Sequence, residues 1–76
     1  TVVRYRLRKP ASVRLSVHSL TGQRVRLLVG GNQIAGMHEV AWDGRSDDGS
    51  PVATGPYLVR LESAGVTQAR QVTVLR

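Results

Sequence analysis

Residues 36–61 read GMHEVAWDGRSDDGSPVATGPYLVRL, and this stretch contains two strand patterns on either side of a polar loop. Every second residue from His38 to Trp42 forms one face of the first pattern, and every second residue from Tyr57 to Leu61 forms one face of the second. A period of two is that of a β-strand, whereas an amphipathic helix repeats every 3.6 residues or so. The Asp, Gly and Ser residues between the two patterns are typical of a turn. We therefore expect two strands joined by a tight polar loop.

The same period of two continues toward the beginning of the chain. Apolar residues alternate with arginines over residues 2–8, and apolar residues alternate with polar ones over residues 13–18. Pro10 separates the two stretches, because proline has no N–H to donate to a sheet ladder. Both stretches are predicted strands.

A hairpin is predicted in the middle of the chain. Gly22 is expected to supply the positive φ of its turn. Val25, Leu27 and Val29 follow on the face that we expect to be buried. Residues 30–32, Gly-Gly-Asn, are interpreted as a loop.

A short piece around Val52 and a closing strand over residues 67–75, with Val72 and Val74 inward, complete a set of seven strands. No stretch of the sequence has the period of an amphipathic helix. Short strands with glycine-rich turns predict an all-β fold, a small antiparallel immunoglobulin-like β-sandwich of about seven strands. The chain has no Cys, so this sandwich contains no disulfide.

The composition restricts the chain to one small domain with a basic surface. Its 76 residues leave room for a single core, and the net charge is +6. The alternation assigns all of the aromatic residues, Tyr5, Trp42 and Tyr57, to the core. Binding of single-stranded nucleic acid needs aromatic rings on the surface, and so does stacking on sugars. We therefore expect no nucleic-acid partner.

Candidate catalytic groups are sparse. Ser16 and His18 share one face of a predicted strand, but no third residue orients them and no G-x-S-x-G turn is present. We interpret the pair as part of a solvent-exposed strand face and expect no enzymatic activity. His38, in register with Val40 and Trp42, is interpreted as an inward histidine with a satisfied hydrogen bond.

Three carboxylates, Asp43, Asp47 and Asp48, fall in the polar loop. We interpret them as turn groups that accept hydrogen bonds from nearby N–H groups. A calcium site is the alternative, since carboxylates and carbonyls are oxygen ligands, although the loop lacks the spacing and distant Glu of a helix-loop-helix site. Two His without Cys do not make a zinc site, so we expect no metal and no other cofactor.

One block of the sequence, Gly36-x-His38-x-Val40-x-Trp42-Asp43-Gly44 and its continuation to Tyr57, resembles two related families. These are the Ig-like domain of flagellar hook-capping proteins and the C-terminal sorting domain of the type IX secretion system. The motif residues that carry the resemblance are Gly36, His38, Trp42, Asp43, Gly44, Asp47, Gly49, Gly55 and Tyr57. The opening strands and the final residues QVTVLR are similar to the sorting family.

The resemblance to the sorting family implies that residues 1–76 are one non-catalytic C-terminal module of a larger secreted protein. Such a module directs export from the periplasm through the outer membrane and retains a covalently linked upstream passenger, often a hydrolase, at the bacterial cell surface. Its partner would be the export machinery of the outer membrane. An Ig-like assembly scaffold of the hook-capping type is the first alternative, and a carbohydrate-binding module is the second.

Two groups of residues are candidates for recognition under this interpretation. The closing strand is expected to be recognised by addition to another sheet. Its candidate residues are Arg70, Val74, Leu75 and Arg76. A basic face is expected to bind anionic lipopolysaccharide weakly. Its candidate residues are Arg4, Arg6, Arg8, Arg14, Arg24 and Arg26.

Overall fold

The computed structural model describes residues 1–75, and this part of the chain forms six strands. They are β1 (Val2–Leu7), β2 (Ala11–His18), β3 (Arg24–Gln33), β4 (Gly36–Ala41), β5 (Gly55–Ser63) and β6 (Val66–Val74). The described residues contain no helix that is long and apolar enough to cross a membrane.

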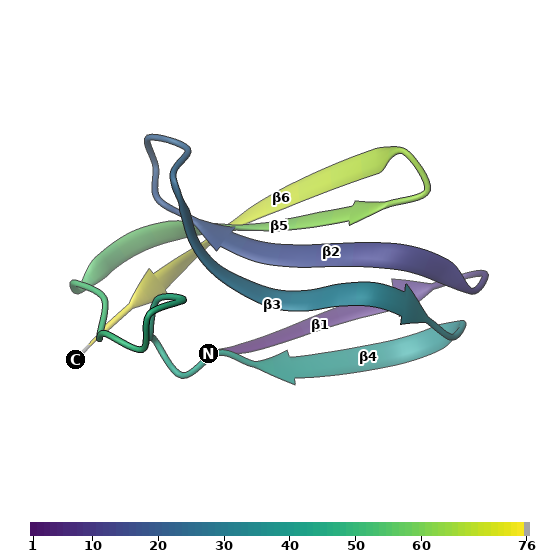
Figure 1. Ribbon diagram of the computed structural model, residues 1–76, viewed down its shortest axis with the longest axis horizontal. Coiled ribbons are helices and arrows are strands. Elements are labelled where there is room, and N and C mark those ends of the chain that lie inside the picture. Colours follow the sequence, from purple (N-terminus) through teal and green to yellow (C-terminus); the bar gives the residue numbers. More distant parts are fainter. Residues whose placement is uncertain (76) are drawn as a thin grey trace.

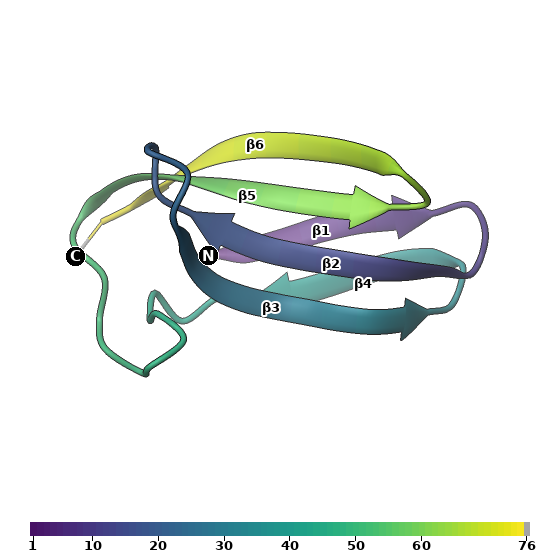
Figure 2. The same cartoon turned by 45° about the horizontal axis from the view of Figure 1, so that its top comes forward.

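The strands form two antiparallel sheets that pack face to face (Figure 1). The smaller sheet consists of β1 and β4, and the larger has the order β3-β2-β5-β6. Turning the molecule shows β4 behind β2 and β3 and β1 behind the space between β2 and β5, whereas β6 extends beyond the smaller sheet (Figure 2). The predicted Ig-like β-sandwich is therefore confirmed.

The core lies between the two sheets and includes two of the three predicted aromatic residues, whereas Tyr57 is half-buried and packs against its border. Tyr5 of β1 is 8% exposed, and Trp42, which follows β4, is 3% exposed. The buried hydrophobic residues are Tyr5, Leu7, Val13, Leu15, Val17, Trp42, Val59 and Val74. The side chains at every second position of β1 and β2 therefore face inward, as the alternation predicts.

The described residues contain six strands and not the predicted seven. The piece around Val52 forms no strand, and this loop contributes only an isolated bridge between Arg45 and Pro51. Pro51 has no N–H to extend a ladder, and the surrounding Asp, Gly and Ser residues favour turns.

β3 differs most from the prediction. Residues 30–32 are not a loop, because they continue β3 and pair with β2. Register shifts also occur along the β2–β3 pairing, and the first leaves Leu28 without an opposite residue. Such a bulge turns the next side chain to the other face. Leu27 is therefore exposed, contrary to the prediction, whereas Leu28 packs against the core.

Candidate functional site

The loop between β4 and β5 is anchored by two aromatic side chains. Trp42 and Tyr57 pack edge to face, with ring centroids 5.6 Å apart and an interplanar angle of 75°. Trp42 Nε1 donates to the carbonyl of Arg45 at 2.9 Å, and the Tyr57 hydroxyl donates to the carbonyl of Ala53 at 2.6 Å. The polar tips of the buried Trp42 ring and the half-buried Tyr57 ring therefore hold the two ends of the loop.

Two aspartates stabilise the loop internally, as predicted. Asp43 Oδ1 accepts a hydrogen bond from the backbone N–H of Arg45 at 3.0 Å. Asp48 Oδ1 accepts hydrogen bonds from the Ser46 hydroxyl and from the backbone N–H of Ser50. These bonds, first that of Ser46 and then those of Ser50, lower the pKa of Asp48, because they favour its charged form. Gly49 closes the turn with a φ of 85°, which a side chain would strain.

Asp47 does not serve the turn but reaches β3. Its backbone N–H donates to the carbonyl of Val25 at 2.9 Å, and its Oδ1 accepts from the N–H of Leu27 at 2.9 Å. Its Oδ2 also lies 3.2 Å from Arg24 Nε. Because β3 is an edge strand, these bonds cover backbone groups that would otherwise face water. The sequence shows Asp47 as one of three loop carboxylates and gives no indication of this contact.

The three loop aspartates do not converge on one point. Asp43 and Asp48 accept hydrogen bonds within the loop, and Asp47 bonds to β3. Among residues 1–75, no three His, Asp or Glu side chains are grouped so that they could hold a metal ion. The geometry of these three aspartates therefore does not form the alternative, a calcium site in this loop.

His38 packs on the inner side of β4. It is half-buried and stacks on Tyr5, with ring centroids 5.1 Å apart and an interplanar angle of 17°. Its Nε2 lies 2.8 Å from the carbonyl of Ile34, to which it donates. Burial by the surrounding residues raises the pKa of Tyr5. This histidine therefore fastens the β3–β4 connection to the core.

Ser16 and His18 are hydrogen-bonded, with Ser16 Oγ 2.8 Å from His18 Nε2. His18 Nδ1 lies 3.4 Å from the carbonyl of Gly22. The predicted solvent-exposed face is wrong for Ser16, which is 1% exposed. Leu27 of β3 and Arg60 of β5 flank it on the neighbouring strands. A hydroxyl sealed in this way cannot meet a substrate, so the pair fastens β2 to the turn at Gly22.

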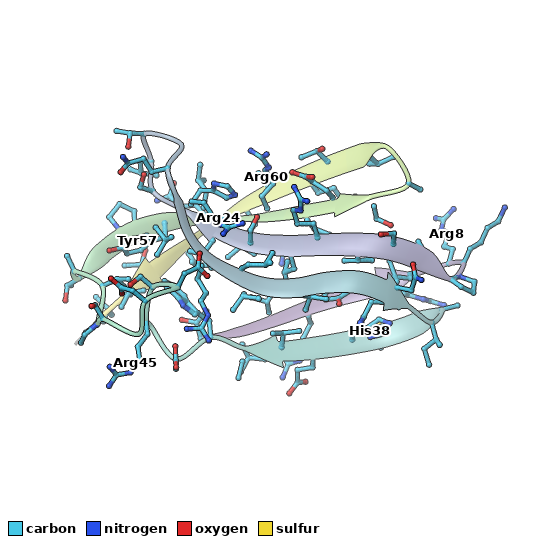
Figure 3. All side chains as sticks on the ribbon, viewed as in Figure 1. Arg8, Arg24, His38, Arg45, Tyr57 and Arg60 are labelled. Atoms are coloured by element: carbon cyan, nitrogen blue, oxygen red, sulfur yellow. The ribbon has the colours of Figure 1, made fainter. Side chains whose placement is uncertain are left out.

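The six arginines of the predicted basic face are divided between the two sheets. The outer side of the smaller sheet and the turn that follows it carry Arg4, Arg6 and Arg8. The larger sheet carries Arg14, Arg24 and Arg26. Figure 3 shows Arg8 at the end of the sandwich where β1 leads into β2, far from Arg24. The six side chains therefore do not form one surface.

Three of these arginines have acidic neighbours. Arg4 forms an ion pair with Glu39 at 2.9 Å, Arg24 with Asp47 at 3.2 Å, and Arg26 with Asp43 at 3.9 Å. Arg26 also donates to the carbonyl of Ser46 at 3.2 Å. The polar loop thus places an acidic partner beside both arginines of β3.

The candidate recognition residues of the closing strand have different environments. Val74 is 8% exposed and belongs to the core, so a partner can reach it only if β6 detaches. Leu75 follows β6 and is 82% exposed. Arg70 is exposed on β6, opposite Val59. Arg76 lies outside the described residues.

A groove runs between β1 and β6, which we call the β1–β6 groove. Its floor includes Leu15, Val59 and Leu61. A second hollow, lined by Leu7 and the basic residues that follow it, continues the groove and shares Leu61 and Gln68 with it. Within the part of the chain that the structure describes, neither lining contains Asp or Glu. Sequence reasoning missed this groove, although the alternating arginines of β1 are its visible signal.

The comparisons with known proteins agree with this architecture. The family model for the FlgD Ig-like domain matches residues 1–66. A solved structure described as FlgD from P. aeruginosa is similar, with a TM-score of 0.73 and 25% identity. The similarity covers 96% of this chain and 59% of that chain, so this chain spans a little over half of the matched structure. No curated protein matches the sequence.

These findings confirm the resemblance to the Ig-like domain of hook-capping proteins, whereas the resemblance to the type IX sorting domain stays a prediction. The family match includes β1 to β5 and the loop anchored by Trp42 and Tyr57. The chain therefore belongs to the FlgD Ig-like domain family.

Proposed function

We propose that this chain is a non-catalytic assembly module of the flagellar hook-capping type, which contacts other protein subunits. The observation that carries the proposal is the family match over residues 1–66. The similarity to FlgD from P. aeruginosa over 96% of the chain supports it further.

The side-chain chemistry is consistent with a scaffold. The Ser16 hydroxyl is sealed beneath its neighbours, and the loop aspartates are committed to hydrogen bonds that hold the backbone. What the described residues offer to a partner is instead a set of strand edges and charged side chains on a β-sandwich. Strand edges can pair with segments of other proteins.

A chimeric protein tests the proposal. Residues 1–76 would replace the matching Ig-like portion of FlgD in P. aeruginosa, and hooks would be counted by electron microscopy. We expect hooks and filaments to form. The matched control is the same chimera carrying Trp42→Ala, which should lose them because its core is damaged. A chimera that folds and accumulates normally but forms no hooks would contradict the proposal.

A second candidate function, export through the type IX system and retention at the cell surface, is favoured by the exposed Leu75 beside the free edge of β6. A reporter fused to residues 1–76 in a host with that system should then reach the surface. Leu75→Ser and Arg70→Glu should reduce its export, because both change exposed residues and leave the buried Val74 in place. A reporter that stays in the periplasm would exclude this candidate.

A further inference from the structure

Among residues 1–75, the backbone of β1 is hydrogen-bonded to another strand on one side only. Thr1 and Trp42 exchange both of their backbone hydrogen bonds, at 2.7 and 3.2 Å. In an antiparallel ladder, pairs of this kind alternate with pairs that exchange none, and the β1–β4 register runs without a break. The N–H and C=O groups of Val2, Arg4 and Arg6 therefore point away from β4, along the free edge of β1.

This free edge borders the β1–β6 groove, under the part of the larger sheet that the smaller sheet leaves uncovered (Figure 2). Leu61 and Val72 in the groove are only half-buried. Gln68 and Arg70 of β6 share the inner face of the sheet, because they lie opposite Leu61 and Val59. The groove thus occupies the position of a third strand of the smaller sheet.

The rim of the groove carries positive charge. Arg6, Arg8 and Lys9 line one part of it, and Arg70 lines the other. Within residues 1–75 none of these four side chains forms an ion pair. A second copy of this chain has the same basic edge and a net charge of +6, so like-charge repulsion opposes pairing between copies.

We propose that the β1–β6 groove binds one extended acidic segment of a partner protein, which adds to β1 as a seventh strand. Its backbone bonds to the free groups of Val2, Arg4 and Arg6. Its acidic side chains lie beside the arginines on the outer face, and its apolar side chains cover Leu61 and Val72. About six residues, at about 3.3 Å each, match the length of β1.

The proposal rests on the proposed function, since it names the chemistry of a subunit that an assembly module contacts. The charge of the rim selects an acidic strand over a neutral or basic one. The free backbone groups and the apolar floor select an extended segment over a lone anion.

A peptide of defined pattern tests the groove. The probe is a capped peptide of about nine residues in which glutamate alternates with valine. The control peptide has the same composition, with the glutamates grouped at one end. Upon addition of the probe to the folded chain, we expect slower amide hydrogen exchange at Val2, Arg4 and Arg6, measured by NMR. The amides of Val3 and Tyr5 already bond to β4 and should not change.

Matched variants separate the contribution of charge from that of the backbone. Arg6→Glu should weaken binding of the probe about tenfold. Arg14→Glu, the same change at an exposed arginine of the larger sheet, should weaken it by about twofold or less. Arg6→Pro should weaken binding more than Arg6→Gln, because proline also removes the N–H at the free edge. Circular dichroism would verify that each variant folds.

Four outcomes would overturn the proposal. They are no binding of the probe, equal binding of the control peptide, protection of amides on the outer face of the larger sheet, and concentration-dependent protection of the β1 edge without peptide. The last would show pairing between copies of the chain. If the chimera assembles hooks and any of these outcomes is observed, only the proposal that the β1–β6 groove binds an acidic segment is rejected. A bound probe without hook assembly would reject the proposed function alone.

Discussion

β1 and β3 are both edge strands with arginine at alternate positions, yet their edges have different environments. The edge of β3 is covered by the loop between β4 and β5, where Asp47 bonds to the backbone of Val25 and Leu27. The edge of β1 has no such cover among the described residues and opens onto a basic groove. A similar local sequence therefore produces a closed edge where a distant loop reaches it, and an open edge elsewhere.

Removing Trp42, which anchors the loop that covers the edge of β3, should have the largest effect on stability. Trp42→Ala should reduce the free energy of unfolding by about 3–5 kcal/mol, because it leaves a cavity in the core. The loop also loses the hydrogen bond to the carbonyl of Arg45. Urea unfolding measures the loss, and Met37→Ala, at a side chain 67% exposed, serves as the control. Similar midpoints for the two variants would contradict the core assignment.

Removing the contact between Asp47 and β3 should have a smaller effect than removing Trp42. Asp47→Ala should reduce the free energy of unfolding by about 1–2 kcal/mol, because the N–H of Leu27 loses a charged acceptor. Amide exchange at Leu27 should become faster, so that the edge of β3 resembles that of β1. Asp47→Asn retains an acceptor oxygen and should be intermediate. If exchange at Leu27 is the same in Asp47→Ala as in the parent, the loop does not protect this edge.

The arginines of the two edges should respond differently to neutralisation. Arg24→Gln removes an exposed ion pair with Asp47 and should cost about 0.2–1 kcal/mol at low salt, with the cost disappearing at high salt. Arg6→Gln removes a charge that has no acidic partner within residues 1–75, and should change stability by about 0.5 kcal/mol or less. Thermal unfolding at two salt concentrations compares them. Equal losses would mean that the two edges are electrostatically alike.

Acidification should have the smallest effect, and it acts on the covering loop. The pKa of Asp48 is lowered from its ordinary value of 3.8, so its carboxylate stabilises the fold above that value. This contribution is lost as the pH falls through the lower pKa of the folded state. Asp48→Asn should therefore show a smaller decrease in Tm between pH 7 and pH 3 than the parent chain does. Parallel decreases would exclude a role for Asp48 in acid stability.

Much of the fold could be predicted from the sequence, because strand alternation is a local property. The burial of Tyr5 and Trp42 and the positive φ of Gly22 were predicted from their immediate neighbours. The prediction was wrong for β3, where a bulge turns Leu27 to the exposed face. The position of this bulge depends on how β3 pairs with β2, which the sequence of β3 alone does not show. The burial of Ser16 was missed for the same reason, because side chains of the two flanking strands cover it.

The candidate site was less predictable than the fold. The sequence showed the arginines of β1, but it could not show that Arg70 on β6 lies across a groove from them. It also could not show that the acids nearest to β3 come from a loop about 20 residues further along the chain.

By itself, the sequence determined an all-β chain with a small aromatic-anchored core, because a period of two and the choice of turn residues act over a few neighbouring positions. Only the tertiary structure decided which edge is closed and which stays open. The edge of a strand is covered when backbone groups and charges from a distant segment lie against it. A pattern of neighbouring residues does not show which distant segment will do so.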